Sequence, residues 1–152
     1  MSAKRLKVIE ERCVGCRICE LSCSMSHQNG AFNPRYGLIR VESRREIGLH
    51  KPVSNMDCPH ICRQCEPAPC ADICPVEAFL SNAALSIRIV DQEACIGCGQ
   101  CPDACPYGMV LMDHQTDRAL KCDLCGGDPW CVRYCPVGAL VFAEKGEGDD
   151  GP

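Results

Sequence analysis

Cysteine is the residue type in this chain that could do chemistry, because 17 of its 152 residues are cysteines and 16 of these fall into four short runs. In the third run, which ends before Pro106, the cysteines have the spacing C-x2-C-x2-C-x3-C: Cys95, Cys98, Cys101 and Cys105. This spacing is typical of bacterial proteins with paired [4Fe–4S] clusters, in which the fourth cysteine binds the other cluster of the pair. Gly97 and Gly99 would let the backbone approach a cluster closely. The run therefore predicts an iron–sulfur site.

Three further runs repeat this pattern with small changes. The first run has the same spacing, with Ser24 in place of the proline: Cys13, Cys16, Cys19 and Cys23. The second run has a longer middle gap that contains two prolines: Cys62, Cys65, Cys70 and Cys74. The fourth run has the longest middle gap: Cys122, Cys125, Cys131 and Cys135. The remaining cysteine is Cys58, and we predict that it is not a ligand because the second run already supplies four.

Other uses of so many cysteines fit the sequence less well. Disulfides are disfavoured because the cysteine count is odd and the first residues show no secretory signal, which indicates a reducing cytoplasm as the location. Structural zinc sites usually pair two separated C-x2-C segments and do not need four cysteines in one compact run. We therefore predict four [4Fe–4S] clusters as the cofactors of this chain.

Charge and hydropathy limit the partners that the chain could have. The formal net charge is −4. Each cluster with its four thiolates would add about −2, so the loaded protein would carry about −12. This charge argues against nucleic acid as a partner and suits docking to basic protein surfaces. No stretch approaches 18 apolar residues, so we expect no direct membrane insertion.

No second kind of reactive site accompanies the cysteines. The chain contains no G-x-G-x-x-G and no G-x-x-x-x-G-K-[ST] segment, so neither a dinucleotide loop nor a nucleoside-triphosphate loop is predicted. Each set of four cysteines would occupy every iron, which leaves none open to a substrate. The sequence therefore predicts a carrier of electrons with no catalytic site of its own. A subunit of a complex, a freely diffusing polyferredoxin and a cluster-storage protein all remain open.

The cysteine runs alternate with segments that should form short strands and helices. A strand is predicted at residues 4–9, and a helix over residues 18–26 because Ser24 does not interrupt it. For His27 at the end of this helix, a hydrogen-bonded role is favoured over iron ligation or proton conduction. The sequence also predicts two hairpins and a closing strand: 79–82 with 85–90, 109–112 with 118–121, and 139–142.

The longest gap between cysteines, residues 28–57, is predicted to be an insertion. Residues 37–43 alternate like a strand, and we expect residues 51–56 to return beside them. The insertion is the most basic part of the chain, with these cationic residues: Arg35, Arg40, Arg44, Arg45 and Lys51. A solvated face and a docking surface for a partner subunit are both open. Residues 144–152 are acidic and glycine-rich, which predicts a disordered tail.

The internal repeat determines the expected architecture. Each unit contains a cysteine loop, a short helix that ends at or near Cys-Pro, and a hairpin. Two units form a bacterial ferredoxin domain around two clusters. Four units therefore predict an α+β fold with two 2[4Fe–4S] ferredoxin domains, built of short helices and β-hairpins, together with the insertion. The spacing alone leaves open whether the paired runs are nested or consecutive.

The chain resembles the four-cluster ferredoxin subunits of modular oxidoreductases over roughly residues 10–142. The matching segments are Cys62-Arg-Gln-Cys-Glu-Pro-Ala-Pro-Cys70, Cys95-Ile-Gly-Cys-Gly-Gln-Cys-Pro-Asp-Ala-Cys-Pro-Tyr-Gly108, and Lys121-Cys-Asp-Leu-Cys125 with Trp130-Cys-Val. The resemblance implies nested pairing, with residues 1–27 and 106–143 in the first ferredoxin-like domain and residues 58–105 in the second. It implies four ligand sets: Cys13, Cys16, Cys19 and Cys135; Cys62, Cys65, Cys70 and Cys105; Cys95, Cys98, Cys101 and Cys74; Cys122, Cys125, Cys131 and Cys23.

Within that family, the first run followed by His27 and Asn33-Pro34 is most similar to the iron–sulfur subunits of tungsten aldehyde oxidoreductases. Related subunits serve carbon monoxide dehydrogenase, benzoyl-CoA reductase and formate dehydrogenase-type complexes. The resemblance implies a subunit that relays electrons between a tungsten- or molybdenum-pterin catalytic subunit and a flavin-containing subunit, an NAD-linked subunit or another acceptor.

Overall fold

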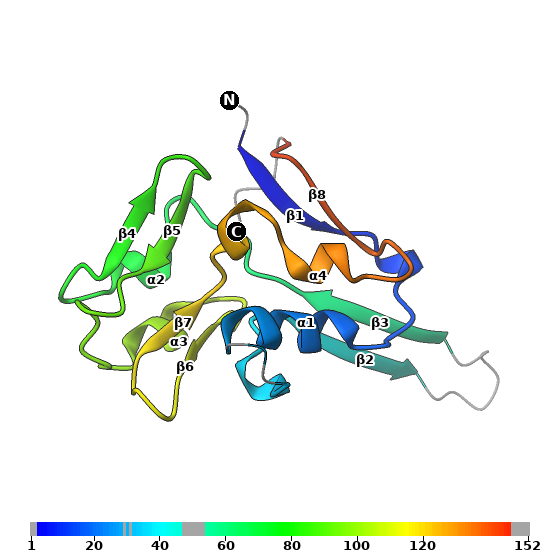
Figure 1. The fold of residues 1–152 in the computed structure, drawn as a ribbon, viewed down its shortest axis with the longest axis horizontal. Helices are drawn as coiled ribbons and strands as arrows, with labels where there is room; N and C mark the ends of the chain where they lie inside the picture. Colours follow the sequence, from blue (N-terminus) through cyan, green and yellow to red (C-terminus); the bar gives the residue numbers. More distant parts are fainter. Residues whose placement is uncertain (1–2, 29, 31, 47–53, 147–152) are drawn as a thin grey trace.

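The computed structural model describes residues 3–28, 30, 32–46 and 54–146, and these form an α+β fold of short elements (Figure 1). The strands are β1 Lys4–Val8, β2 Arg40–Glu46, β3 Ser54–His60, β4 Phe79–Asn82, β5 Ile87–Val90, β6 Val110–Met112, β7 Ala119–Lys121 and β8 Leu140–Glu144. The helices are α1 Ile18–His27, α2 Pro69–Asp72, α3 Gln100–Ala104 and α4 Trp130–Arg133. Short 3₁₀ turns lie at Glu10–Arg12, Pro34–Tyr36 and Leu124–Gly127. The described strands pair as four antiparallel two-stranded sheets: β1–β8, β2–β3, β4–β5 and β6–β7.

The β1–β8 sheet joins segments from the two ends of the chain. It runs from Lys4 opposite Glu144 to Val8 opposite Leu140. Helix α1 packs against α4 in the same half of the molecule, which brings the first and fourth cysteine runs together (Figure 1). The strands predicted at 4–9 and 139–142 are confirmed, and β8 continues to Glu144, the first residue of the predicted tail. Residues 147–152 of that tail lie outside the described residues.

The second and third cysteine runs lie in the other half of the molecule, with the hairpins β4–β5 and β6–β7 (Figure 1). Helix α2 packs against α3, and β5 lies beside β7. Both predicted hairpins are confirmed, although β5 begins at Ile87 rather than at residue 85. Ser86 adopts a positive φ of 53°, so the chain is still turning just before β5 begins.

Helix α1 is the longest described helix, because serine follows its last cysteine where the other runs have proline. It has 10 residues, whereas α2, α3 and α4 have four or five. Proline lacks the N–H that a helix interior needs, so each of the other helices ends close to its Cys-Pro pair. The Ser24 hydroxyl donates to Leu21 O at 2.9 Å and accepts the Asn33 N–H at 3.2 Å. The predicted helix over 18–26 is confirmed, with His27 as one additional residue.

The insertion forms a hairpin that is shifted from the predicted one. In the structure β2 and β3 pair from Arg40 opposite His60 to Glu46 opposite Ser54. Strand β2 starts at Arg40 because the Pro34–Tyr36 turn occupies the preceding segment, and the Arg40 guanidinium closes that turn by donating to Pro34 O at 2.8 Å. Strand β3 continues to His60, beyond the predicted end of the insertion. Residues 51–53 and the side chains of Arg44 and Arg45 lie outside what the structure describes.

The apolar core is small and connects the two halves. Its main cluster includes Leu6, Leu140 and Leu124 from one half and Ile61 and Ile87 from the other. A smaller cluster lies around Phe79, between the second and third runs. Eight cysteines are among the 24 buried apolar residues in the described part of the chain, so cysteine makes up a large part of the interior.

Candidate metal centres

One cavity brings together cysteines from two different runs. The four cysteines that line it are Cys62, Cys65, Cys70 and Cys105. Cys105 follows α3 directly, and it reaches this cavity because α3 packs against α2. The cavity therefore contains three cysteines of the second run and the last cysteine of the third run.

A second cavity contains the reciprocal combination. The four cysteines that line it are Cys74, Cys95, Cys98 and Cys101. Gly97 and Gly99 in its loop both have positive φ, at 71° and 73°. A Cβ on Gly97 would clash with the carbonyl oxygen of Asp117, so this glycine is needed for contact with the β6–β7 turn as well as for the loop conformation.

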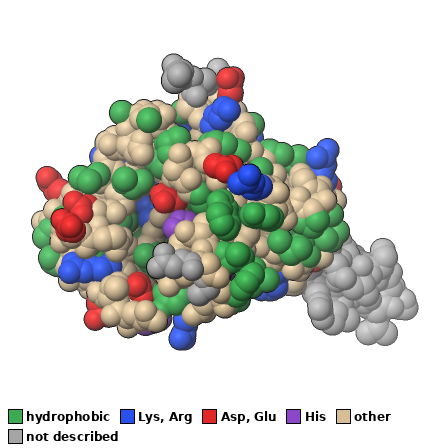
Figure 2. All heavy atoms as spheres, viewed as in Figure 1, with side chains coloured by type: hydrophobic (Ala, Val, Ile, Leu, Met, Phe, Trp, Pro, Cys, Tyr) green, Lys and Arg blue, Asp and Glu red, His purple; other side chains and the backbone are tan. Residues whose placement is uncertain are grey.

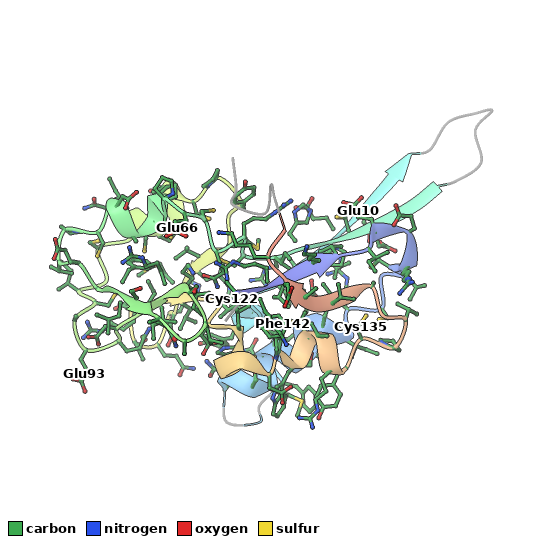
Figure 3. The ribbon with its side chains drawn as sticks, turned by 90° about the horizontal axis from the view of Figure 1, so that it is seen from above. Glu10, Glu66, Glu93, Cys122, Cys135 and Phe142 are labelled. Carbon is green, nitrogen blue, oxygen red and sulfur yellow. The ribbon has the colours of Figure 1, made fainter. Side chains whose placement is uncertain are left out.

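The first and fourth runs meet where α1 packs on α4. Burial raises the pKa of the Cys131 thiol, and the nearby sulfurs of Cys23 and Cys125 raise it further. Ser26 Oγ lies 3.6 Å from Cys125 Sγ, which also joins the end of α1 to the fourth run. Cys135 follows α4 and lies at the start of the turn into β8 (Figure 3). The structure thus places Cys131 beside Cys23 and Cys125, and it places the helix before Cys135 against the helix that carries Cys19.

Backbone N–H groups donate to the last cysteine of each run. In the three Cys-Pro runs the donor lies four residues later: Ala78 to Cys74 at 3.3 Å, Met109 to Cys105 at 3.4 Å, and Ala139 to Cys135 at 3.2 Å. In the first run the donor to Cys23 is Leu38, at 3.3 Å from the sulfur. Such hydrogen bonds stabilise thiolate charge. These hydrogen bonds were not predicted from the sequence. The repeated Cys-Pro pair could have indicated the three that have the same four-residue spacing.

Burial makes these thiols poor acids in the absence of a cation. It raises the pKa of Cys19 to about 12 and the pKa values of Cys70 and Cys101 to about 11, because a thiolate loses its hydration in the interior. Iron would supply the compensating positive charge, since metal binding requires deprotonated sulfur. Grouped sulfurs, N–H donors and cavities lined by four cysteines together fit the binding of [4Fe–4S] clusters.

Comparison with protein families agrees with this geometry. A family model described as a 4Fe-4S dicluster domain matches residues 53–145, and one described as a 4Fe-4S binding domain matches residues 10–26. The chain belongs to the 4Fe-4S dicluster domain family. The [4Fe–4S] ferredoxin character predicted from the cysteine spacing is therefore confirmed.

Three curated relatives of this dicluster protein have names that refer to electron transport or to oxidoreductases. A tetrathionate reductase subunit of Salmonella typhimurium is 33% identical over 88% of this chain and 54% of the relative, so the chain spans about half of that protein. The polyferredoxin-like subunit of aliphatic sulfonate oxidoreductase of Pyrococcus furiosus is 34% identical over 84% of this chain and 69% of its own length. Electron transport protein HydN of Escherichia coli is 33% identical over 88% of this chain and 84% of its own length.

Solved structures related to benzoyl-CoA reductase share the fold of this dicluster protein. A chain of the active site complex BamBC in complex with 1,5 dienoyl-CoA superposes with a TM-score of 0.52 and 25% identity. The superposition covers 96% of this chain and 78% of the other. No helix in the described part of the dicluster protein is long and apolar enough to cross a membrane.

A buried lysine accompanies the cavity of Cys62, Cys65, Cys70 and Cys105. Lys121 Nζ donates to Gln64 Oε1 and, at 2.8 Å, to the carbonyl oxygen of Arg88. The Lys121 side chain is only 7% exposed and lines the same cavity as the cysteines. Gln64 is also buried and donates to Cys122 O at 2.6 Å. The segment Lys121-Cys122 was noted in the sequence, but the position of this cation could not be read from it.

Two residues that were predicted not to bind iron, His27 and Cys58, also have described hydrogen bonds. His27 Nε2 is 3.0 Å from Asp123 Oδ1, and its Nδ1 is 2.8 Å from Cys23 O, so the predicted hydrogen-bonded helix end is confirmed. The hydrogen bond with Asp123 raises the pKa of His27 to about 11. Cys58 lies on β3, where its Sγ donates to Glu10 Oε1 at 3.3 Å. It lines a groove between β1 and β3 rather than either four-cysteine cavity.

Proposed function

We propose that this chain is an electron-transfer subunit of a multi-subunit oxidoreductase and has no catalytic site of its own. The observation that carries the proposal is that four cysteines from two different runs line each of two cavities, while the first and fourth runs meet where α1 packs on α4. When bound there, [4Fe–4S] clusters accept and donate single electrons. The names of the relatives, which refer to electron transport and to oxidoreductase subunits, support the same conclusion.

The proposed ligand sets are nested, so that each cluster takes three cysteines of one run and the last cysteine of its partner run. The two cavities support this for Cys105 with the second run and for Cys74 with the third run. The proximity of Cys23 to Cys131 and the packing of α1 on α4 support it for the first and fourth runs. On this proposal the fourth ligand of Cys13, Cys16 and Cys19 is Cys135.

Contacts between sites suggest the order in which electrons pass. Gln64, which lies between Cys62 and Cys65, donates to Cys122 O at 2.6 Å, and Cys62 and Cys122 belong to the same apolar cluster. Cys122 therefore connects the fourth-run site to the second-run site. Cys70 and Cys101 belong to the other apolar cluster, where α2 packs against α3, which connects the second-run site to the third-run site. We infer the order first, fourth, second, third, named by the run that supplies three cysteines.

The proposed partners are a tungsten- or molybdenum-pterin catalytic subunit and an acceptor subunit that holds flavin. The similarity of the first run to iron–sulfur subunits of tungsten aldehyde oxidoreductases supports the catalytic partner, and residues 28–57 are a candidate contact to it. A carbon monoxide dehydrogenase, benzoyl-CoA reductase or formate dehydrogenase-type partner is the alternative, and the shared fold with the BamBC chain supports this class. The need for reduced thiols supports a cytoplasmic location.

Anaerobic purification of the tagged chain from its native host tests the proposal. We expect a larger subunit to co-purify at a fixed ratio, with tungsten or molybdenum detected by elemental analysis. The complex should lose electron transfer to its acceptor when this chain is removed and regain it when the chain is added back. Recovery of the chain alone, still able to reduce several unrelated acceptors, would instead identify a freely diffusing polyferredoxin.

A further inference from the structure

The four cysteine loops differ in how far they reach solvent, and this difference distinguishes the two ends of the molecule from its middle. The second cysteine of each run occupies the equivalent loop position. Cys16 and Cys98 are exposed there, whereas Cys65 and Cys125 are only partly exposed. The first-run and third-run sites are the two ends of the order inferred above, so the exposed cysteines mark where electrons would enter and leave.

The residue after the first cysteine of each run also differs between the two ends and the middle of the molecule. Val14 in the first run is 61% exposed and Ile96 in the third run is 62% exposed. The equivalent positions in the second and fourth runs hold the charged residues Arg63 and Asp123. An exposed aliphatic side chain beside an exposed cysteine is therefore a feature of the two ends, and exposed apolar clusters commonly mark protein interfaces.

The Cys98 end has additional exposed apolar side chains. Ile73 is 45% exposed and Val76 39%. Val76 and Ile96 line the same cavity as Cys98, so they lie beside the candidate cluster. Ile73 directly precedes Cys74 of the same site. These residues form the apolar centre of a surface that we call the Cys98 face.

Exposed carboxylates lie beside the cysteines of the Cys98 face in the sequence, although Arg88 shares a groove with one of them, Asp72. Four exposed acids each lie within three residues of a cysteine of this site: Asp72, Glu77, Glu93 and Asp103. Residues 71–81 and 91–108 contain no lysine and no arginine. Glu93 projects from the end of the molecule opposite Cys135 (Figure 3). Figure 2 shows both acidic and basic side chains along that edge. The Cys16 end differs, because Arg12, Arg17 and Arg133 are exposed there.

We propose that the Cys98 face docks a redox partner whose surface has an apolar centre surrounded by lysine and arginine side chains. The inference rests on the proposed electron-transfer function. It adds that the partner at the Cys98 end of the molecule has a positively charged docking surface. Carboxylates around an apolar centre would steer a basic partner to the face, and the apolar residues would hold it once water is displaced. In the transfer step one electron leaves the reduced cluster of the third-run site and reduces the cofactor of the partner, and no atoms are exchanged.

Cytochrome c, a basic haem protein, is a suitable probe for this face. The iron-loaded chain is reduced with dithionite, freed of excess reductant, and mixed with ferric cytochrome c in a stopped-flow instrument. The test variant carries Glu93→Lys and Asp103→Lys. The control variant carries Glu10→Lys and Glu11→Lys, which make the same change in net charge beside Cys13 of the first run.

At low ionic strength we expect the test variant to reduce cytochrome c about tenfold more slowly than wild type, within the range of electrostatic steering. The control variant should change the rate less than about twofold, and both differences should shrink as salt screens the charges. Equal slowing by the two variants would show that net charge rather than this face directs docking, and slowing that persists at high salt would show a changed driving force. Either result would overturn the proposal.

A separate measurement distinguishes failure of the docking face from failure of the proposed function. Wild-type protein should lose visible absorbance on addition of dithionite and regain it as cytochrome c is reduced. A wild-type protein without this reversible change would contradict electron transfer itself, and with it the docking proposal. Reversible bleaching with unchanged rates in the Glu93→Lys, Asp103→Lys variant would contradict only the docking face.

Discussion

At the residue scale, Lys121 is a cation placed in the interior beside sulfur. Its ammonium group donates to the side-chain oxygen of Gln64 and to the backbone carbonyl oxygen of Arg88, and both oxygens are uncharged. The negative charge that balances the ammonium group must therefore come from the cysteine site that Lys121 lines. Burial raises the pKa of Cys70 to about 11, and the charge of Lys121 partly offsets this increase. A cation in this position would stabilise an added electron as well as a thiolate.

We therefore predict that Lys121→Gln lowers the reduction potential of one cluster, the cluster bound by Cys62, Cys65, Cys70 and Cys105. Removal of a nearby positive charge makes the reduced form, which carries one more negative charge, less favourable. A redox titration followed by electron paramagnetic resonance measures this potential. Lys121→Arg keeps the charge and should keep the potential, and Lys4→Gln removes an exposed charge near Phe142 as a control. Equal shifts of all clusters would contradict a local effect.

Cys58 allows a second test at this scale. We predict that Cys58→Ser keeps all four clusters, because the thiol donates to Glu10 Oε1 and a serine hydroxyl can make the same hydrogen bond. Iron and sulfide content of the purified variant should equal that of wild type. Cys65→Ser, in the adjacent run, is the matched control and should disturb one cluster. Loss of about a quarter of the iron from Cys58→Ser would show that the ligand assignment of the second run is wrong.

At the element scale, the sequence predicted the helices and hairpins whose bounds depend on residues close together in the chain. The length of α1 follows from Ser24, and the hairpins β4–β5 and β6–β7 follow from short alternating segments. The shift of β2–β3 could not be predicted, because the Pro34–Tyr36 turn and the Arg40 guanidinium determine where β2 starts. The Leu38 N–H to Cys23 and the Lys121 contact to Gln64 also escaped prediction, since each joins residues that are far apart in the sequence.

The packing of α1 on α4 leads to a prediction about ligation. In the nested arrangement, Cys135→Ala should disturb the cluster bound by Cys13, Cys16 and Cys19, because α4 carries Cys135 into that half of the molecule. The paramagnetic signal lost in Cys135→Ala should then match the signal lost in Cys16→Ala. Under consecutive pairing it would match the signal lost in Cys98→Ala. Cys16 and Cys98 are the exposed cysteines of the described chain, so these reference variants should disturb the fold least.

At the scale of the whole molecule, the candidate sites and the core share eight cysteines. The buried set contains eight cysteines, and the two apolar clusters are arranged around them. Two-stranded sheets of three to seven residues have little stability of their own. The fold must therefore obtain much of its stability from bonds between sulfur and metal rather than from hydrocarbon burial.

Removal of iron should accordingly unfold the protein. The loaded chain should contain about sixteen iron atoms and about sixteen sulfides. After chelation, buried thiols such as Cys19 remain protonated and uncharged, but they no longer link α1 to α4 or α2 to α3, and only the small apolar clusters oppose the chain entropy. We expect the circular dichroism of secondary structure to collapse and most amides to exchange rapidly with solvent. Anaerobic reconstitution with iron and sulfide should restore both signals, because the same bonds would form again. A cooperative thermal transition in iron-free protein would contradict this account, since it would require a core that is sufficient without metal.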